Sequence, residues 1–265
     1  MPGETAHVVG DLAAPDVARR IVEDVSPDMV VHAQALSNVD QCETEPAQAY
    51  RMNAQAPELL CRACAPREIP VVALSTDYVF NGDKGAPYDE HDEPRPINVY
   101  GLSKLDGERA VARYPRGYVV RPSTLYGPAR KNFCNTIVDQ AQQGRPIQAF
   151  LDQTTSPTYT ADLAEALHAM LRALSAGGGR DVPRVLHLAN GGGCRRTEFA
   201  ARALQLLNQP LSLMQPIGMA QQARPAVRPS YSVLTSRYAA QVRGARLRSW
   251  DAALEAYLRS RHWIN

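Results

Sequence analysis

Thr76, Tyr100 and Lys104 are the residues of this chain whose types and spacing suggest chemistry. Tyr100 and Lys104 are four residues apart, so on a helix they project from the same face. A phenol has an unperturbed pKa of about 10, and a nearby ammonium group lowers that pKa because it favours the ionised form. Tyr100 could then exchange a proton with a carbonyl or alcohol, while Thr76 donates a hydrogen bond to the same oxygen. These groups suit a carbonyl reductase.

The elements that must position these groups can be read from the flanking sequence. A Tyr-x-x-x-Lys spacing alone is weak evidence, because exposed helices often carry such a pair for packing. Here the apolar run at 69–74 leads into Thr76, which predicts a buried parallel strand that ends in a loop. Ligands bind at that end of the strands in open α/β sheets. A helix at about 99–113 would bring Tyr100 and Lys104 to the same place.

Helices and strands alternate through the first half of the chain. The expected elements are a strand at 7–10, a helix at 15–24, a strand at 28–35, a helix near 45–65, the strand at 69–74, the helix at 99–113 and a strand at 117–122. This alternation is typical of an α/β fold with a parallel sheet and crossover helices.

The regular alternation of strands and helices ends after residue 127. A helix at 133–143 is followed by a loop with glycine and proline, and several prolines interrupt 207–231. We therefore expect 1–128 to be a Rossmann-like, dinucleotide-binding part. Residues 129–265 would form mainly a smaller substrate-binding lobe, with 161–190 returning to the main sheet.

Composition argues against several classes of partner. The chain has 265 residues, 45% of them hydrophobic, and 29 basic against 27 acidic residues give a formal charge of +2. This balance provides no electrostatic case for binding nucleic acid or a membrane, so we expect neither. No apolar run approaches the roughly 18 residues of a membrane span. The odd number of cysteines, five, and the absence of a signal-like start predict a cytoplasmic protein.

Cys61 and Cys64 form a Cys-x-x-Cys pair, which in some proteins binds a metal or acts in redox chemistry. Here the pair lies within the helical-looking segment 56–65, and no second pair completes a zinc site. We interpret both residues as buried helix cysteines and expect no metal.

A colinear series of motifs resembles a known family over nearly the whole chain. The longest are Ser-Thr-Asp-Tyr-Val-Phe-Asn-Gly at 75–82 and Asn-Val-Tyr-Gly-Leu-Ser-Lys-Leu-Asp-Gly-Glu at 98–108. Shorter matches are Val-His-Ala-Gln-Ala at 31–35, Lys-Gly-Ala-Pro-Tyr at 84–88, Arg-Pro-Ser at 121–123, Asp-Gln at 152–153, Ser-Pro-Thr-Tyr-Thr at 156–160 and Arg-Pro at 228–229. They resemble the extended short-chain dehydrogenase/reductase family, in its dTDP-4-dehydrorhamnose reductase branch.

This resemblance implies an activity and a site. It implies that Thr76, Tyr100 and Lys104 are catalytic, that NADPH or NADH donates a hydride, and that the substrate is a nucleotide-linked 4-keto-6-deoxy sugar. A homodimer is left open. The residues implied to contact the cofactor are Asp11, Leu12, Ala33, Gln34, Ala35, Asn53, Tyr100, Lys104 and Ser123. Those implied to contact the substrate are Thr76, Asp77, Tyr78 and Thr124, the last at a position where this branch often has tryptophan.

Several of these positions also have a structural interpretation. Asp11 could cap a helix or hold a loop, and Asn53 could be a helix cap. Asp77 could be an exposed loop carboxylate, and Tyr78 could be a core aromatic. We interpret His32 as a satisfied packing neighbour, because the catalytic set already supplies the acid.

The resemblance also predicts that one part of the family pattern is missing. Family members open with a strand, a Gly-x-x-Gly-x-x-Gly turn and a helix that hold the pyrophosphate. The segment at 7–12 instead resembles the family's third strand, so about one βαβ unit of roughly 30 residues is expected to be absent. The strand at 29–33 would then have an open apolar edge. A start site placed too far downstream, a fragment completed by another chain and a degenerate homologue each explain this pattern, and we favour the first.

Two other functions remain open beside reduction. One is a non-catalytic regulatory homologue of the same fold, which binds a partner enzyme. The other is a nucleotide-sugar epimerase or dehydratase, which recycles its bound cofactor and so does not consume NADPH.

Overall fold

Four parallel strands form the main sheet in the computed structural model, which describes residues 7–177 and 182–265. The strand order is β1-β2-β3-β8. Val71 pairs with Val30 on one side and with Gly117 on the other, and Val120 pairs with Leu186. The α/β class with a parallel, Rossmann-like sheet is confirmed. The strands are β1 (Val30–His32), β2 (Val71–Leu74), β3 (Gly117–Arg121) and β8 (Val185–His187).

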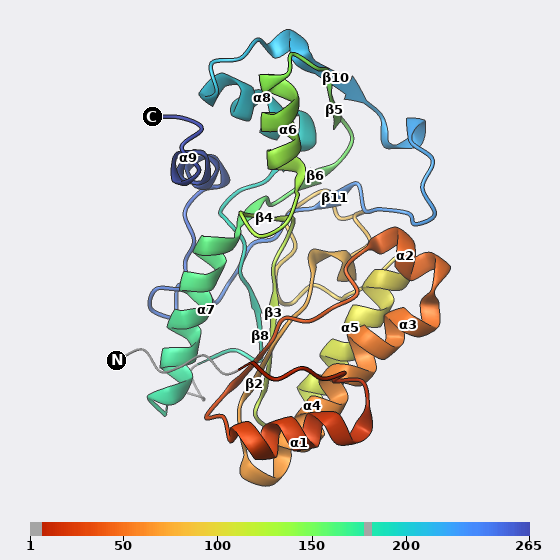
Figure 1. Ribbon diagram of the computed structural model, residues 1–265, viewed down its shortest axis with the longest axis vertical. Helices are drawn as coiled ribbons and strands as arrows, with labels where there is room; N and C mark the ends of the chain where they lie inside the picture. Colours follow the sequence, from red (N-terminus) through yellow and green to blue (C-terminus); the bar gives the residue numbers. More distant parts are fainter. Residues whose placement is uncertain (1–6, 178–181) are drawn as a thin grey trace.

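Helices cover both faces of this sheet (Figure 1). Val71 and Ala73 pack with helices on one face, while Val72, between them, packs with a helix on the opposite face. This alternation follows from the two-residue period of a strand, and a strand buried on both faces reads as a continuous apolar run. The first face carries α1 (Pro15–Val25), α4 (Ala56–Cys64) and α5 (Val99–Arg113), and the other carries α7 (Thr160–Ser175).

The strand predicted at 7–10 is wrong, because this segment runs without strand pairing in the structure. Val8 and Val9 are exposed, at 53% and 100%. Within the described residues, β1 is the outer strand of the main sheet and Val31 on it is 42% exposed. A strand needs a neighbour that accepts and donates its backbone hydrogen bonds, and no described strand lies beside residues 7–10.

The helix predicted near 45–65 is divided into several pieces. A wider π-helical turn in the middle buries Asn53, which holds the loop after β1 through hydrogen bonds to both backbone groups of Leu36. Such turns often mark positions where a helix serves a site. The pieces are α3 (Pro46–Tyr50), the π-helical η1 (Arg51–Gln55), α4 and the short η2 (Ala65–Arg67). A separate short helix, α2 (Val39–Thr44), precedes them.

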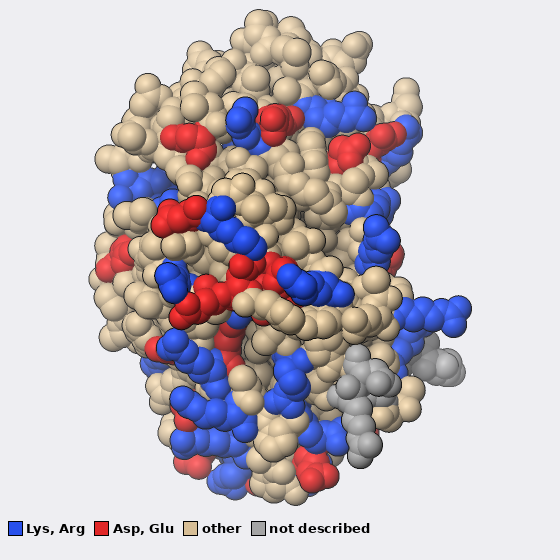
Figure 2. Space-filling view, turned by 180° about the vertical axis from the view of Figure 1, so that it is seen from behind, with Lys and Arg blue, Asp and Glu red and all other residues tan. Residues whose placement is uncertain are grey.

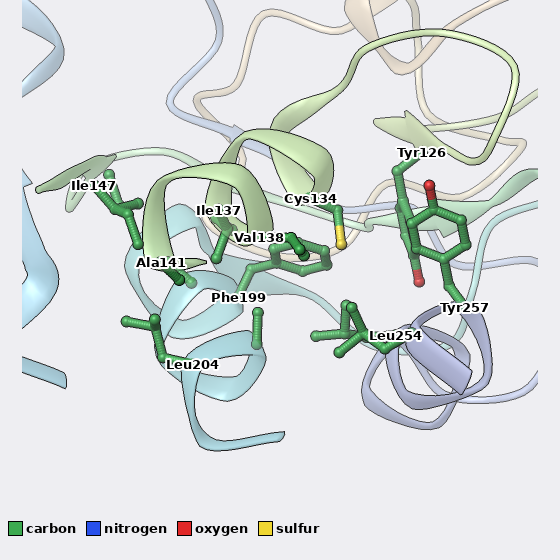
Figure 3. Close-up of a cluster of buried hydrophobic side chains, with 14 of the residues drawn as sticks. Tyr126, Cys134, Ile137, Val138, Ala141, Ile147, Phe199, Leu204, Leu254 and Tyr257 are labelled. Carbon is green, nitrogen blue, oxygen red and sulfur yellow. The ribbon is translucent and has the colours of Figure 1, made fainter. Parts of the chain in front are cut away.

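A smaller lobe lies above the carboxyl ends of the main strands (Figure 1). Its core joins side chains from three helices and several strands, and Figure 3 shows Ile137, Phe199 and Leu254 among them. Tyr126 and Tyr257 close one end of this core, with ring centroids 5.5 Å apart. The elements of the lobe are α6 (Phe133–Gln142), α8 (Arg196–Leu206), α9 (Trp250–Ser260) and the parallel pair β5 (Ile147–Phe150) and β10 (Met214–Ile217).

Short elements join the sheet to this lobe. One small sheet has the order β11-β6-β9, and a separate pair joins β4 to β7. The strands are β4 (Leu125–Tyr126), β6 (Thr154–Thr155), β7 (Thr158–Tyr159), β9 (Cys194–Arg195) and β11 (Tyr231–Ser232), and the short helices are η3 (Asp77–Val79), η5 (Leu211–Leu213) and η6 (Met219–Gln221).

The five cysteines are all buried and free. Burial raises the pKa of Cys61 to about 12 and that of Cys64 to about 11, so neither thiol is a ready nucleophile. The interpretation of this pair as buried helix cysteines is confirmed. In the described part of the chain, no group of three or more His, Cys, Asp or Glu side chains could hold a metal ion.

Charged side chains of both signs are interspersed on the face seen from behind, so that face has no extended surface of one sign (Figure 2). Among the helices of the described residues, none combines the length and the apolar character that crossing a membrane requires.

The smaller lobe should depend strongly on its fully buried leucines. We expect Leu254→Ala to lower the free energy of unfolding by about 2–5 kcal/mol, because it removes buried apolar surface and leaves a cavity. Urea denaturation measures this change. The matched control is Leu211→Ala, whose side chain is 48% exposed, and equal losses for the two variants would contradict the packing described.

Candidate active site

A cavity of about 540 Å³ opens at the carboxyl ends of β2 and β3. Its walls come mainly from the loop after β2, the first turn of α5 and the segment after β3, with single residues of α2, α7 and α8. The predicted site residues that line it are Thr76, Asp77, Tyr78, Tyr100, Ser123 and Thr124. Segments separated in the sequence therefore meet where open α/β sheets bind ligands.

Helix α5 places Tyr100 at this cavity. The side chain of Asn98 caps the helix by accepting a hydrogen bond from the backbone N–H of Gly101 (2.8 Å). The helix can approach the loop after β2 only because residue 101 is glycine, since a Cβ there would lie 2.2 Å from the carbonyl oxygen of Tyr78. The helix ends at Arg113, two residues before a proline, as predicted.

Thr76 is fixed by its neighbours on the loop after β2. Its hydroxyl Oγ1 accepts a hydrogen bond from the backbone N–H of Tyr78 (3.1 Å) and lies within hydrogen-bond distance of Oδ1 of Asp77 (3.1 Å). A side-chain hydrogen bond also links Thr76 to Tyr100. The hydroxyl and the phenol therefore face one point in the cavity.

Lys104 lies one turn further along α5 and is almost fully buried. Its Nζ donates a hydrogen bond to the carbonyl oxygen of Leu74, the last residue of β2 (2.7 Å). Burial lowers the pKa of this ammonium to about 8, while the charge of Glu108 partly opposes the shift. The group therefore loses its proton at a lower pH than an exposed lysine does, but it is still mostly an ammonium at neutral pH.

The expectation that an ammonium lowers the pKa of Tyr100 is wrong for the protein alone. Burial raises this pKa, whereas the hydrogen bond with Thr76 lowers it. Desolvation dominates because a buried phenolate would lose its hydration. Tyr100 is therefore a neutral phenol, which suits a proton donor better than a base.

A buried ion pair holds the end of β2 against α5 and β3. Arg121 donates to both oxygens of Glu108, at 2.9 Å from Nε and 2.6 Å from Nη2. The hydroxyl of Ser75 donates to the same carboxylate. A bidentate pair fixes orientation as well as distance, so this contact sets the position of the strand end that carries Thr76.

Two of the residues implied to contact the substrate, Asp77 and Thr124, have unusual surroundings or backbone geometry. Asp77 is 2% exposed, so the alternative of an exposed loop carboxylate is wrong. Thr124 has a φ of 36°, an uncommon value for a β-branched residue, and this strain lies at the cavity wall.

The residues implied to hold the rest of the cofactor lie apart from this cavity. Asp11 forms an ion pair with Arg51, and its Oδ1 accepts a hydrogen bond from the backbone N–H of Ala13 (3.0 Å), so it holds its own loop. Leu12 follows it in the same loop. The segment with Ala33, Gln34 and Ala35 follows β1 and is partly exposed.

The structural interpretations of Asn53 as a helix cap and of His32 as a satisfied packing neighbour do not hold in the structure. Asn53 lies within η1 instead of capping a helix, and its Nδ2 also donates to the hydroxyl of Ser103 on α5 (3.0 Å). His32 is buried, yet its Nε2 has no hydrogen-bond partner in the described chain, so it is not a satisfied neighbour. Burial lowers the pKa of His32 to about 4, which keeps the ring neutral.

A second cavity, which sequence reasoning missed, adjoins the first. Its volume is about 550 Å³, and Tyr78 and Arg196 line both cavities. Arg224 and Arg228 also line it. Burial lowers the pKa of Arg224, and the positive charge of Arg228 lowers it further. Arg228 pairs with Asp40 (2.7 Å), but no described carboxylate lies within salt-bridge distance of Arg196 or Arg224.

The guanidinium groups of this second cavity are held over aromatic rings. Arg196 lies 5.2 Å from the ring centroid of Phe133, and Arg224 lies 5.0 Å from that of Phe150. These guanidinium groups repel one another and are not all neutralised by carboxylates, so they suit an anionic ligand. Of these arginines only Arg228 carried a sequence signal, through the Arg-Pro motif at 228–229.

The depressed pKa of Lys104 gives a test of its burial. Between a folded-state pKa of about 8 and the ordinary value of 10.5, the unfolded chain binds more protons, so stability rises with pH. Methionine does not titrate. The free energy of unfolding of the wild type relative to Lys104→Met should therefore increase by about 3 kcal/mol between about pH 7 and about pH 11, measured by urea denaturation. A difference that does not change with pH would contradict a buried ammonium.

Comparison with known proteins gives relatives over nearly the whole chain. A dTDP-4-dehydrorhamnose reductase of Mycolicibacterium smegmatis is 38% identical over 248 residues, which cover 92% of this chain and 73% of the relative. The enzyme of the same name from Mycobacterium tuberculosis strain H37Rv is 40% identical over 254 residues, covering 94% and 81%.

The fold also matches a solved structure. The crystal structure of dTDP-4-dehydrorhamnose reductase from Bacillus anthracis in complex with NADP has a TM-score of 0.86 and 31% identity, and covers 94% of this chain and 86% of that one. The family described as RmlD substrate binding domain matches residues 5–262. The resemblance noted in the sequence is thus confirmed, and the chain belongs to the RmlD substrate binding domain family.

Proposed function

We propose that this chain reduces the C4 keto group of a dTDP-linked 6-deoxy sugar, with NADPH or NADH as hydride donor. One observation carries the proposal. The cavity that joins Thr76 and Tyr100 opens beside an arginine-lined cavity, and Tyr78 and Arg196 belong to both. A sugar carbonyl can therefore lie at the phenol while a nucleotide diphosphate lies among the guanidinium groups.

Tyr100 donates the proton and Thr76 holds the reacting oxygen. The neutral phenol of Tyr100 protonates the sugar oxygen as negative charge develops on it. The Thr76 hydroxyl donates to the same oxygen, and this hydrogen bond strengthens as the alkoxide forms. The Lys104 ammonium, one helical turn away, favours the tyrosinate that remains.

The residues present fit the nicotinamide end of the cofactor. An ammonium has three donors, and Lys104 uses one on the carbonyl oxygen of Leu74, which leaves donors for ribose hydroxyls. When bound, the nicotinamide supplies the hydride. Ser123 lines the cavity that holds Thr76 and Tyr100, and the loop of Ala33, Gln34 and Ala35, which Asn53 anchors, would border the cofactor. Asp11 and Leu12 would lie at its adenine end.

Arg196, Arg224 and Arg228 would bind the diphosphate of the substrate. Guanidinium groups match phosphate oxygens with paired, charge-assisted hydrogen bonds. All three come from the chain after residue 128, which supports a substrate-binding role for that lobe. Tyr78 and Thr124 would face the sugar between the two cavities, and a homodimer remains part of the proposal.

Replacing Tyr100 by phenylalanine tests the reaction. We expect Tyr100→Phe to lower kcat for NADPH-dependent reduction of dTDP-4-dehydrorhamnose by at least about 10²-fold, because the proton donor is lost. Cofactor binding should survive. The control is Tyr50→Phe, whose ring is exposed on α3. Full turnover by Tyr100→Phe would contradict the assignment, and turnover without net NADPH consumption would indicate an epimerase.

Replacing Arg196 by glutamine tests the diphosphate site. We expect Arg196→Gln to weaken dTDP binding by about tenfold or more, measured by calorimetry, because it removes a charge-assisted hydrogen bond. The matched control on the same helix is Arg202→Gln, which lies outside the cavity and pairs with Glu255 (3.9 Å). Equal dTDP affinity for the Arg196 variant and the wild type would exclude the second cavity as this site.

A further inference from the structure

Asp77 joins three segments of the chain through its two carboxyl oxygens. Ser123, after β3, and Ser232, on β11, both donate to Oδ2, at 2.8 and 2.6 Å. Oδ1 contacts the Thr76 hydroxyl at 3.1 Å. The carboxyl group is 2% exposed, so water does not complete its hydrogen bonds as it would at the surface.

The charge of Asp77 decides whether the Thr76 hydroxyl can donate a hydrogen bond to a ligand. A threonine hydroxyl has one donor and two acceptor sites. The backbone N–H of Tyr78 uses one acceptor site. If Asp77 is ionised, the hydroxyl proton points at Oδ1, and Thr76 can only accept from Tyr100 or a ligand. Thr76 then cannot donate to a developing alkoxide.

A neutral Asp77 reverses this arrangement. With its proton on Oδ1, Asp77 donates to Thr76 and fills the second acceptor site. The hydroxyl proton of Thr76 is then directed into the cavity. Oδ2 becomes the carbonyl oxygen of the acid and accepts from Ser123 and Ser232, so every polar atom of the cluster is satisfied.

We propose that Asp77 is a positioning residue that acts as a neutral carboxylic acid and turns the Thr76 proton toward the substrate oxygen. This inference rests on the proposed reductase function. No proton leaves Asp77 during turnover, since it only fixes the direction in which Thr76 donates.

The surroundings of Asp77 favour its neutral form. Burial raises its pKa, and only neutral hydrogen-bond donors oppose that shift, namely the hydroxyl groups of Ser232, Ser123 and Thr76 and the backbone N–H of Asp77 itself. The titratable groups that face it are the phenols of Tyr78 and Tyr100 and the guanidinium of Arg196, and none forms a salt bridge with it within the described residues. A buried carboxyl without an ion pair tends to stay protonated.

Infrared spectroscopy of the free protein tests the protonation directly. The variant Asp77→Asn keeps the shape and donor of the neutral acid but has no carboxyl group. We expect the difference spectrum between wild type and Asp77→Asn at neutral pH to show the carbonyl stretch of a protonated carboxylic acid. A carboxylate band in its place would overturn the proposal. This measurement needs neither cofactor nor substrate, so it stands apart from any failure of the reductase assignment.

Kinetics with NADPH and dTDP-4-dehydrorhamnose separate positioning from a merely structural role. The wild-type kcat should fall as pH rises through the pKa of Asp77, whereas Asp77→Asn should keep a kcat within about threefold of the wild-type plateau and lack this fall. Loss of about 10²-fold in kcat by a folded Asp77→Asn would show that the charge is needed and would overturn the proposal.

Ser232→Ala provides a second variant that retains the acid. It removes a donor that stabilises the carboxylate, so the fall in kcat should move to higher pH by about one unit. An unchanged profile in both variants would contradict control of Thr76 by Asp77. If the wild type oxidises no NADPH, the reductase function fails, while the infrared result still decides the state of Asp77.

Discussion

The close contact between α5 and the end of β2 is the constraint on which the site depends. Lys104 donates a hydrogen bond to the carbonyl oxygen of Leu74 at 2.7 Å, and this bond fixes the position of the helix along the strand. Gly101 permits the approach to the loop after β2, because a Cβ there would lie 2.2 Å from the carbonyl oxygen of Tyr78. Gly107 permits the packing of α5 on η1, because a Cβ there would lie 2.1 Å from the carbonyl oxygen of Asn53. Tyr100 lies beside Thr76 because the backbone of α5 contacts the loop after β2.

Burial sets the chemistry of this contact as much as distance does. The same loss of hydration lowers the pKa of Lys104 and raises those of Tyr100 and Asp77, so all three groups move toward neutrality. The nearby pair of Glu108 and Arg121 is different, because each charge meets its opposite in a bidentate contact at 2.6 and 2.9 Å. The cavity thus combines neutral proton donors with charges that are paired behind it, and Arg196 lines both this cavity and the adjoining one.

Sequence reasoning placed the elements that follow strong local signals. The helix with Tyr100 and the apolar strand before Thr76 follow from periodicity, so their meeting at one sheet edge could be predicted. The π-helical turn at Asn53 could not, because a long-range hydrogen bond to Leu36 stabilises it. The segment at 7–10 has strand propensity but no described partner, and Arg196 and Arg224 meet only through tertiary packing of the smaller lobe. The state of Asp77 likewise depends on Ser232, far away in the sequence.

In the proposed reaction, this chain delivers a hydride to C4 of a dTDP-linked keto sugar. Incubation with dTDP-4-dehydrorhamnose and NADPH deuterated at the transferable C4 position of the nicotinamide tests it most directly, with the product analysed by mass spectrometry and NMR. We expect the reduced sugar to carry deuterium at C4 and the cofactor to be consumed in equal amount. A sugar without the label, in a sample whose protein is folded and binds NADPH, would contradict the claim.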